Sequence, residues 1–219
     1  MSMNEPLMNA SINETPVLTR SEQKRLEILE AGRDLFFAQG YADTSMDQVT
    51  LRSGVSKATV YNHFPSKEKL FEEVVRAGSE CVFSRLLPLD PHHPDPEEML
   101  TKFFQSLTQV LFSTEGACMC HLALSEGRRF PQNAKLIFEA GPGRGLTHMT
   151  QYLSDLNQAG VLKISDPRWA AERLLALIMP LTDFMSSGMQ ALQPPSEAEL
   201  RRIVRFFLQG IDENRPGAQ

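Results

Sequence analysis

Cysteine is scarce in this chain of 219 residues, which contains only three. An odd number of cysteines in a chain of this size argues against a framework of disulfide bonds. Few cysteines without such a framework are typical of proteins that stay in a reducing compartment. We therefore expect a cytoplasmic protein.

Long apolar segments are also missing. No run of apolar residues reaches the length of about 18 that a membrane-spanning helix needs, so we expect no association with a membrane. The N-terminus lacks the basic start and the apolar core of a signal peptide. Residues 1–18 are polar and contain two prolines, and we predict that they form a disordered arm.

Positive charge is not in excess, since 22 Lys and Arg stand against 27 Asp and Glu, for a formal net charge of −5. This balance excludes a uniformly basic protein but not a local basic face. Residues 20–71 carry eight Lys or Arg against seven acidic residues, so this segment is weakly positive. If it binds an anionic partner, its few cations must be well aimed.

The alternation of apolar and polar residues that marks β-strands is absent as well. Apolar residues recur instead at helical spacing, and the sequence predicts an all-α fold. The first helix is predicted over 21–39, with Gly40 at its end. Three further helices are predicted to begin after hydroxyl N-cap residues, at Thr44 or Ser45, Ser56 and Ser66.

The rest of the chain also has helical patterns. Four prolines among residues 88–96 predict a loop, and Asp95 and Pro96 then begin a helix with an N-cap and a proline in the first turn. Asp166-Pro167 repeats this start, and Pro180 is expected to kink the apolar helix that follows. Beyond the helix at Pro96, we predict helices at 115–127, 132–140, 145–159, 167–190 and 197–212.

Residues 44–71 form the most informative segment. Two short helices joined by a turn at Gly54 precede a long helix, which is the layout of a helix-turn-helix motif. The second short helix, from Ser56 to His63, is the candidate for the major groove of DNA. Val60 is the obvious residue to face inward, because the other side chains of this helix are mostly polar.

The segment from about Arg25 to Phe71 resembles the DNA-binding domain of TetR-type transcriptional regulators. The resemblance rests on ILEAGRDLF, GYADTSMDQV, SGVSKATVYNHF and SKEKLF in this order and spacing. It implies a DNA-binding domain over 19–70, a helical ligand-binding and dimerisation domain over 71–214, and a homodimer on a near-palindromic operator. The residues implied in DNA binding are Thr44, Ser45, Ser56, Lys57, Ala58, Thr59, Tyr61, Asn62, His63 and Lys67.

Gly32 departs from the family pattern, in which an alanine is usual at this position. A glycine inside a helix costs about 1 kcal/mol relative to alanine, so we expect Gly32 to weaken the first helix. Thr50 and Ser53 also stand where alanines are common, which predicts looser packing of the helix that carries them.

The resemblance further implies a repressor that leaves DNA when a small apolar or amphipathic effector binds. Ten Met and thirteen Phe suit an adaptable apolar pocket, and Asp183 stands out as a carboxylate within apolar sequence. The candidate ligand-binding residues are Phe104, Leu107, His121, Phe138, Met149, Met179 and Asp183. The last two helices have an excess of apolar residues, and the predicted dimer contacts on them are Leu174, Leu177, Ile178, Leu181, Ile203 and Phe207.

Two other classes of function stay open. Cys118, Cys120 and His121 could sense redox state or bind a soft metal, although their spacing is poor for a zinc site and we expect small buried residues here. The glycines at 141, 143 and 145 resemble a phosphate loop only superficially and are predicted to break a helix. No enzyme motif is present, so we expect no catalytic residue, metal or cofactor. A helical enzyme or adaptor without DNA binding is the last alternative.

Overall fold

The computed structural model describes residues 18–126, 129–178 and 193–211. All regular secondary structure in these ranges is α-helical, which confirms the predicted fold class. No helix within them is long and apolar enough to cross a membrane. The predicted N-terminal arm, save Leu18, and the predicted kink at Pro180 lie outside the described residues.

The N-terminal helices follow the predicted order. Gly40 has a φ of 81° and interrupts the last turn of the first helix, which confirms the break predicted there. Gly54 has a φ of 67°, a left-handed conformation that suits glycine and turns the chain between the second and third helices. The bounds are α1 (Arg20–Asp43), α2 (Met46–Ser53), α3 (Lys57–His63) and α4 (Lys67–Arg85).

Hydroxyl side chains begin each of these helices. The Oγ of Ser45 accepts from the backbone N–H of Gln48 at 3.2 Å, and the Gln48 side chain accepts from the Ser45 N–H at 2.7 Å, which completes a capping box. Ser56 and Ser66 accept from the N–H three residues ahead, each at 3.3 Å. The predicted N-caps are confirmed, with Ser45 rather than Thr44 at the start of α2.

The C-terminal part consists of longer helices. Asp95 caps the first of them, and Ser196 and Glu199 form a capping box at the last, as predicted. The prediction for residues 141–145 is only partly right: Gly141 separates two helices, but Gly143 and Gly145 lie inside the first turns of the second. The bounds are α5 (Pro96–Leu111), α6 (Thr114–Glu126), α7 (Pro131–Ala140), α8 (Pro142–Gln158), α9 (Pro167–Ile178) and α11 (Glu197–Ile211).

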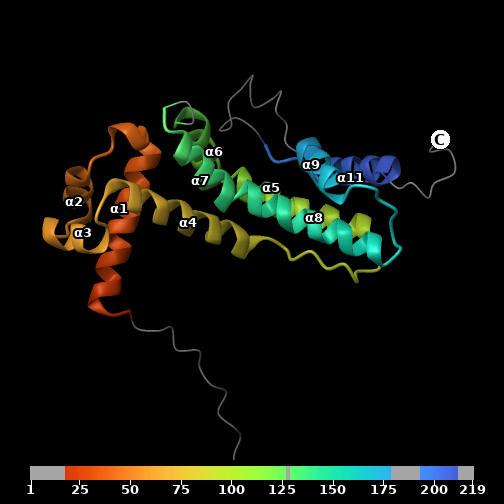
Figure 1. Ribbon diagram of the computed structural model, residues 1–219, viewed down its shortest axis with the longest axis horizontal. Coiled ribbons are helices and arrows are strands. Elements are labelled where there is room, and N and C mark those ends of the chain that lie inside the picture. Colours follow the sequence, from red (N-terminus) through yellow and green to blue (C-terminus); the bar gives the residue numbers. More distant parts are fainter. Residues whose placement is uncertain (1–17, 127–128, 179–192, 212–219) are drawn as a thin grey trace, which may run out of the picture.

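Two apolar cores lie at opposite ends of the molecule, and α4 runs between them (Figure 1). The C-terminal core joins α5, α8, α9 and α11 around fully buried residues such as Phe104, Met149 and Leu174. The N-terminal core joins α1 to α4, but it also takes in Leu122 of α6 and Ile137 of α7. The domain boundary predicted near residue 70 therefore falls inside a shared core.

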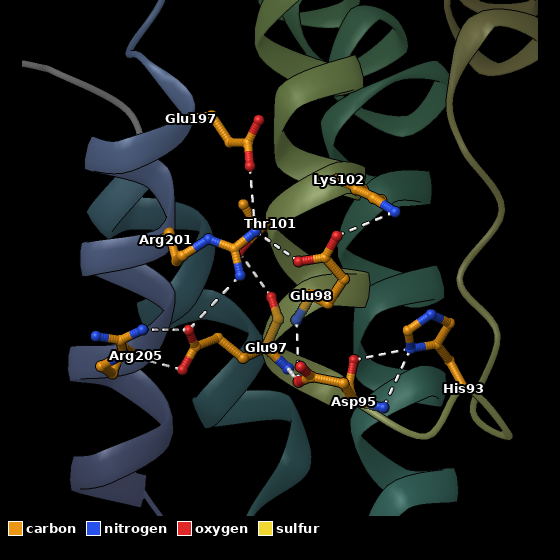
Figure 2. Close-up of polar contacts among 9 residues, drawn as sticks. All are labelled: His93, Asp95, Glu97, Glu98, Thr101, Lys102, Glu197, Arg201 and Arg205. Atoms are coloured by element: carbon orange, nitrogen blue, oxygen red, sulfur yellow. Dashed lines mark hydrogen bonds and ion pairs between the residues drawn. The ribbon is translucent and has the colours of Figure 1, made fainter.

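An ion-pair network joins α5 to α11 (Figure 2). Arg205 donates to both carboxylate oxygens of Glu97, at 2.8 and 3.1 Å, and Arg201 donates to Glu98 at 2.5 Å and to Glu197 at 3.1 Å. The Arg205 and Arg201 guanidinium groups hold the pKa values of Glu97 and Glu98, respectively, below their usual range. Both acids lie in the first turn of α5, where the helix dipole favours negative charge, and the network links this turn to α11.

Candidate DNA-binding interface

The helix α3 has one buried side and one open side. Val60 is fully buried against α1 and α2, as predicted, while Lys57, Ala58 and Asn62 are exposed. The Tyr61 ring is 40% exposed. One side of α3 therefore offers an ammonium group, an amide and a phenol beside a small methyl side chain, a set that can contact both phosphates and base edges.

Lys57 is held by an acidic neighbour. Its Nζ lies 2.6 Å from Oδ1 of Asp47 on α2, and 6.0 Å from the centre of the Tyr61 ring. The hydrogen bond to Asp47 raises the pKa of Lys57, so the side chain stays charged. Lys57 lies where it was predicted, but it must leave Asp47 in order to bind a phosphate.

The N-termini of α2 and α3 face solvent. Ser45 and Ser56 are exposed, and each uses its oxygen as an acceptor for its own helix. Helix N-termini attract anions because their first N–H groups have no partner within the helix. Thr59 is half-buried, and its Oγ1 lies 2.9 Å from the Ser56 Oγ. These groups suit contacts with the DNA backbone.

Thr44 points inward rather than toward solvent. Only 2% of its surface is exposed, and its Oγ1 donates to the carbonyl of Gly40 at 2.7 Å. Its hydroxyl closes the last turn of α1, where the chain leaves the helix. A side-chain contact from Thr44 to phosphate, as predicted, does not fit this placement, because the hydroxyl lies beneath the surface.

The ammonium of Lys67 is fully engaged within the protein. It donates to the backbone carbonyls of Tyr41 and Thr44, both at 2.8 Å, and to that of Ala42 at 3.3 Å. A lysine has three N–H donors, so all of them are used. The Lys67 side chain therefore has a structural role, in which the first turn of α4 holds the end of α1, while DNA binding by Lys67 stays a prediction.

His63 is half-buried at the end of α3. Its ring centre lies 6.5 Å from that of Phe64 in a tilted arrangement, so the histidine packs partly against the core residue that follows it. Tyr61 and Asn62, which directly precede it on α3, are more exposed.

A cluster of aromatic rings links the N-terminal helices to the segment before α7. Tyr41 packs against Phe71 at 5.0 Å and against Phe130 at 4.9 Å between ring centres. The Tyr41 hydroxyl donates to Glu68 at 3.0 Å, and burial together with this carboxylate raises its pKa to about 12. Phe130 precedes α7, and no local pattern in the sequence marked it as a partner of Tyr41.

The predicted ligand-binding residues that the structure describes differ in their placement. Phe104 and Met149 are fully buried in the C-terminal core and Leu107 packs against it, whereas Phe138 is 53% exposed and His121 lies on the surface. Met179 and Asp183 lie outside the described residues. None of the five described candidates lines a pocket that the described residues form between α1, α4, α5 and α6.

Most of the residues predicted to form dimer contacts pack inside the protomer instead. Leu174, Ile178 and Phe207 are buried in the C-terminal core, and Ile203 packs against that core. Leu181 lies outside the described residues, and Leu177 is 45% exposed. Two large side chains outside the predicted set are also exposed on these helices, Trp169 at 51% and Phe206 at 70%.

Cys118 and Cys120 lie on α6, in the segment that was considered as a redox or metal site. Cys118 and Cys120 are half-buried, and burial raises the pKa of the Cys120 thiol, which disfavours the thiolate that a metal or an oxidant needs. Within the described ranges no three His, Cys, Asp or Glu side chains gather closely enough to hold a metal ion.

Comparison with known proteins identifies the family. Residues 28–74 match the model for bacterial regulatory proteins of the tetR family, and residues 98–209 match the C-terminal domain of AefR-like transcriptional repressors. The HTH-type transcriptional regulator UidR of Escherichia coli K12 is 26% identical over 200 residues, which cover 88% of this chain and 95% of UidR.

Solved structures agree with these matches. A TetR-family regulator from Mesorhizobium loti is 30% identical, with a TM-score of 0.73 over 89% of this chain and all of that one. The flavonoid-responsive regulator FrrA is 28% identical, with a TM-score of 0.76 over 88% of this chain and 99% of its own. The chain is a DNA-binding transcriptional regulator and belongs to the TetR family.

Proposed function

We propose that this regulator is a homodimeric repressor that binds a near-palindromic operator through α3 and is released by a small apolar or aromatic effector. The observation that carries the DNA-binding part is the division of α3 into the buried Val60 and the exposed Lys57, Tyr61 and Asn62. Two copies of such a helix on a two-fold dimer would read two half-sites of one operator.

The DNA contact is tested on the promoter region upstream of the protein's own gene by fluorescence anisotropy. We expect Lys57→Gln to weaken binding and to lower the salt dependence by about one phosphate contact. Lys135→Gln is the matched control, because it removes one exposed, ion-paired lysine from α7. Equal affinity of the Lys57→Gln variant and wild type would refute the proposed role of α3.

Asp47 offers a test in the opposite direction. Its carboxylate competes with DNA for Lys57, and as an exposed anion beside the N-terminus of α2 it also repels phosphate. Asp47→Asn should therefore raise DNA affinity and steepen its salt dependence, while Asp155→Asn on α8 should change neither. A loss of affinity in Asp47→Asn would show instead that the ion pair positions Lys57 for binding.

The proposed dimer surface lies on α9 and α11. Trp169, Leu177 and Phe206 are exposed there, although large apolar side chains are usually buried unless a partner covers them. We expect Phe206→Glu to give monomers in sedimentation experiments without loss of helix content. Phe138→Glu, which changes an exposed phenylalanine on α7, should leave the dimer intact. A monomeric wild-type protein at micromolar concentration would overturn this part.

The relatives support the proposed aromatic effector and repression, and the packing supports the proposed link from the effector to the DNA-binding helices. The AefR-like model describes repressors, and FrrA is named for its response to flavonoids, which supports repression and an aromatic effector. A ligand lowers DNA affinity if it prefers the conformation that cannot bind DNA. Leu122 and Ile137 connect α6 and α7 to the core of the DNA-binding helices, so a shift in α6 or α7 would reach α1 and α4.

A further inference from the structure

A pocket of about 160 Å³ lies where the DNA-binding helix α1 meets α4, the end of α5 and α6. Its walls are mainly apolar, with Leu29 and Phe37 from α1, Val74 from α4, Val110 from α5 and Met119 from α6. The pocket is separate from the C-terminal core, in which Phe104 and Met149 were expected to bind a ligand. Helices of both domains therefore contribute to one apolar site.

Gly78 makes room for this pocket. A Cβ added to Gly78 would meet only the Met119 sulfur, at 3.9 Å, so the glycine leaves open a space that another side chain would occupy. A glycine in the middle of α4 lowers the stability of the helix by about 1 kcal/mol relative to alanine. Gly78 does not have the positive φ that would require a glycine at this position. The open space is the structural consequence of this residue.

The size of the pocket corresponds to one ring. An apolar protein cavity of about 150 Å³ holds a benzene molecule, so 160 Å³ suits a single aromatic ring with a small substituent. The Phe37 ring and the Met119 thioether favour an aromatic occupant, because rings pack edge to face with rings and sulfur contacts ring edges. Larger fused-ring molecules would need the helices to separate.

Charges around the pocket favour an uncharged ligand. Glu30 and Glu115 carry negative charge, and Arg33 and Arg85 carry positive charge, so the charged lining residues balance. Arg33 is already paired with Asp34 on α1, with 3.0 Å between the nearest nitrogen and oxygen. A carboxylate or an ammonium would lose its hydration against walls that are mostly apolar, whereas a neutral ring would not.

We propose that the pocket between α1, α4 and α6 binds an uncharged single-ring aromatic molecule, and that its occupancy changes operator affinity. The binding claim stands on the pocket alone. The second claim rests on the proposed function, since an occupant contacts α1 of the DNA-binding unit and α6 of the regulatory unit at once. Any coupling is reciprocal, so operator DNA must change ligand affinity by the same factor.

Binding is tested on the full-length protein with toluene, phenol and benzoate as probes, by calorimetry and by the Met119 methyl resonance. Toluene and phenol should bind and shift this resonance, and benzoate should bind at least tenfold more weakly. Gly78→Leu and Cys81→Leu fill the pocket from two positions and should each lower toluene affinity at least tenfold. Gly78→Ala is the matched control, because its methyl group leaves most of the space open.

Three results would overturn the site: no binding of toluene or phenol at millimolar concentration, benzoate binding as tight as phenol, or unchanged affinity in the filled variants. If Gly78→Leu does not fold, Cys81→Leu decides, because Cys81 is exposed at the pocket mouth. Coupling is tested by measuring phenol affinity with and without the upstream promoter DNA of the anisotropy assay. Equal values would refute coupling, whereas failure to bind any operator would refute the proposed function and leave the ligand site standing.

Discussion

The contact between Gly32 and Leu70 allows a sharp test of how α1 and α4 pack. Gly32 is buried on α1, and an added Cβ would lie 2.9 Å from Leu70 Cδ2, 3.1 Å from its Cγ and 3.2 Å from its Cδ1. Leu70 is fully buried in the N-terminal core, so all of its side chain would have to move. We predict that Gly32→Ala destabilises the protein, contrary to helix propensity alone.

The magnitude follows from two opposing terms. Alanine gains about 1 kcal/mol over glycine in the interior of a helix. Forcing an extra methyl group into a packed core costs about 1–3 kcal/mol. The net loss of unfolding free energy should therefore be about 0–2 kcal/mol. Gly78→Ala, where the nearest atom lies 3.9 Å away, should instead stabilise the protein by about 1 kcal/mol.

Urea unfolding followed by circular dichroism measures both variants, and a double-mutant cycle isolates the contact. Leu70→Ala removes the obstructing atoms and itself costs about 2–5 kcal/mol. In that background Gly32→Ala should become stabilising, because only the propensity term is left. If Gly32→Ala stabilises the wild-type protein as much as Gly78→Ala does, the steric argument for the glycine is wrong.

Three further predictions concern buried and charged groups. Lys67→Met should lower stability by about 1.5–3 kcal/mol in urea unfolding, because three carbonyls at the end of α1 lose a charged donor; unchanged stability would contradict the structural role. Tyr152→Phe should leave the thermal midpoint unchanged or higher, since the buried Tyr152 hydroxyl has no hydrogen-bond partner among the described residues; a clear drop would reveal a missing partner. The lowered pKa values of Glu97 and Glu98 predict that stability present at neutral pH declines below about pH 4.5 as these groups take up protons; the double variant Glu97→Gln, Glu98→Gln should show a shallower acid decline of the urea midpoint.

Local signals in the sequence predicted the helices well, because N-caps and glycine stops act within one turn of chain. Ser45, Ser56 and Ser66 each bind an N–H only three residues away, so their pattern alone indicates their role. The buried face of α3 could be predicted for the same reason, since one apolar residue, Val60, stands among polar ones. The N-caps of the helix-turn-helix and the buried residue of α3 could therefore be predicted without a structure.

Contacts between distant segments were not accessible in this way. From the sequence alone, Lys67 is a candidate cation for binding phosphate. Its three carbonyl partners at the end of α1 lie 23 to 26 residues earlier in the chain, so only the fold shows that they are close. The helix α9 shows the same limit in another form. Leu174 and Leu177 have equal hydrophobicity, and only packing determines that the first is buried and the second 45% exposed.

Most of the positive charges in the DNA-binding unit, residues 20–71, are already paired within the protein. Of the eight cations in residues 20–71, only two have no ion pair or hydrogen bond from the side chain within the described ranges, Arg20 and Lys24. The others bind Asp34, Asp47, Glu72, Glu73 or, for Lys67, backbone carbonyls. Apart from Arg20 and Lys24, a cation of this unit that binds DNA must therefore exchange one partner for another.

Such exchange limits the part of the affinity that depends on salt. Each lysine that reaches a phosphate releases counterions and steepens the salt dependence, whereas neutral donors do not. Ser45, Ser56 and Asn62 are neutral and exposed. Contacts of this kind depend on geometry, so they favour a duplex whose backbone fits the recognition helix. A weakly charged DNA-binding unit thus limits non-specific binding more than it limits recognition of the operator.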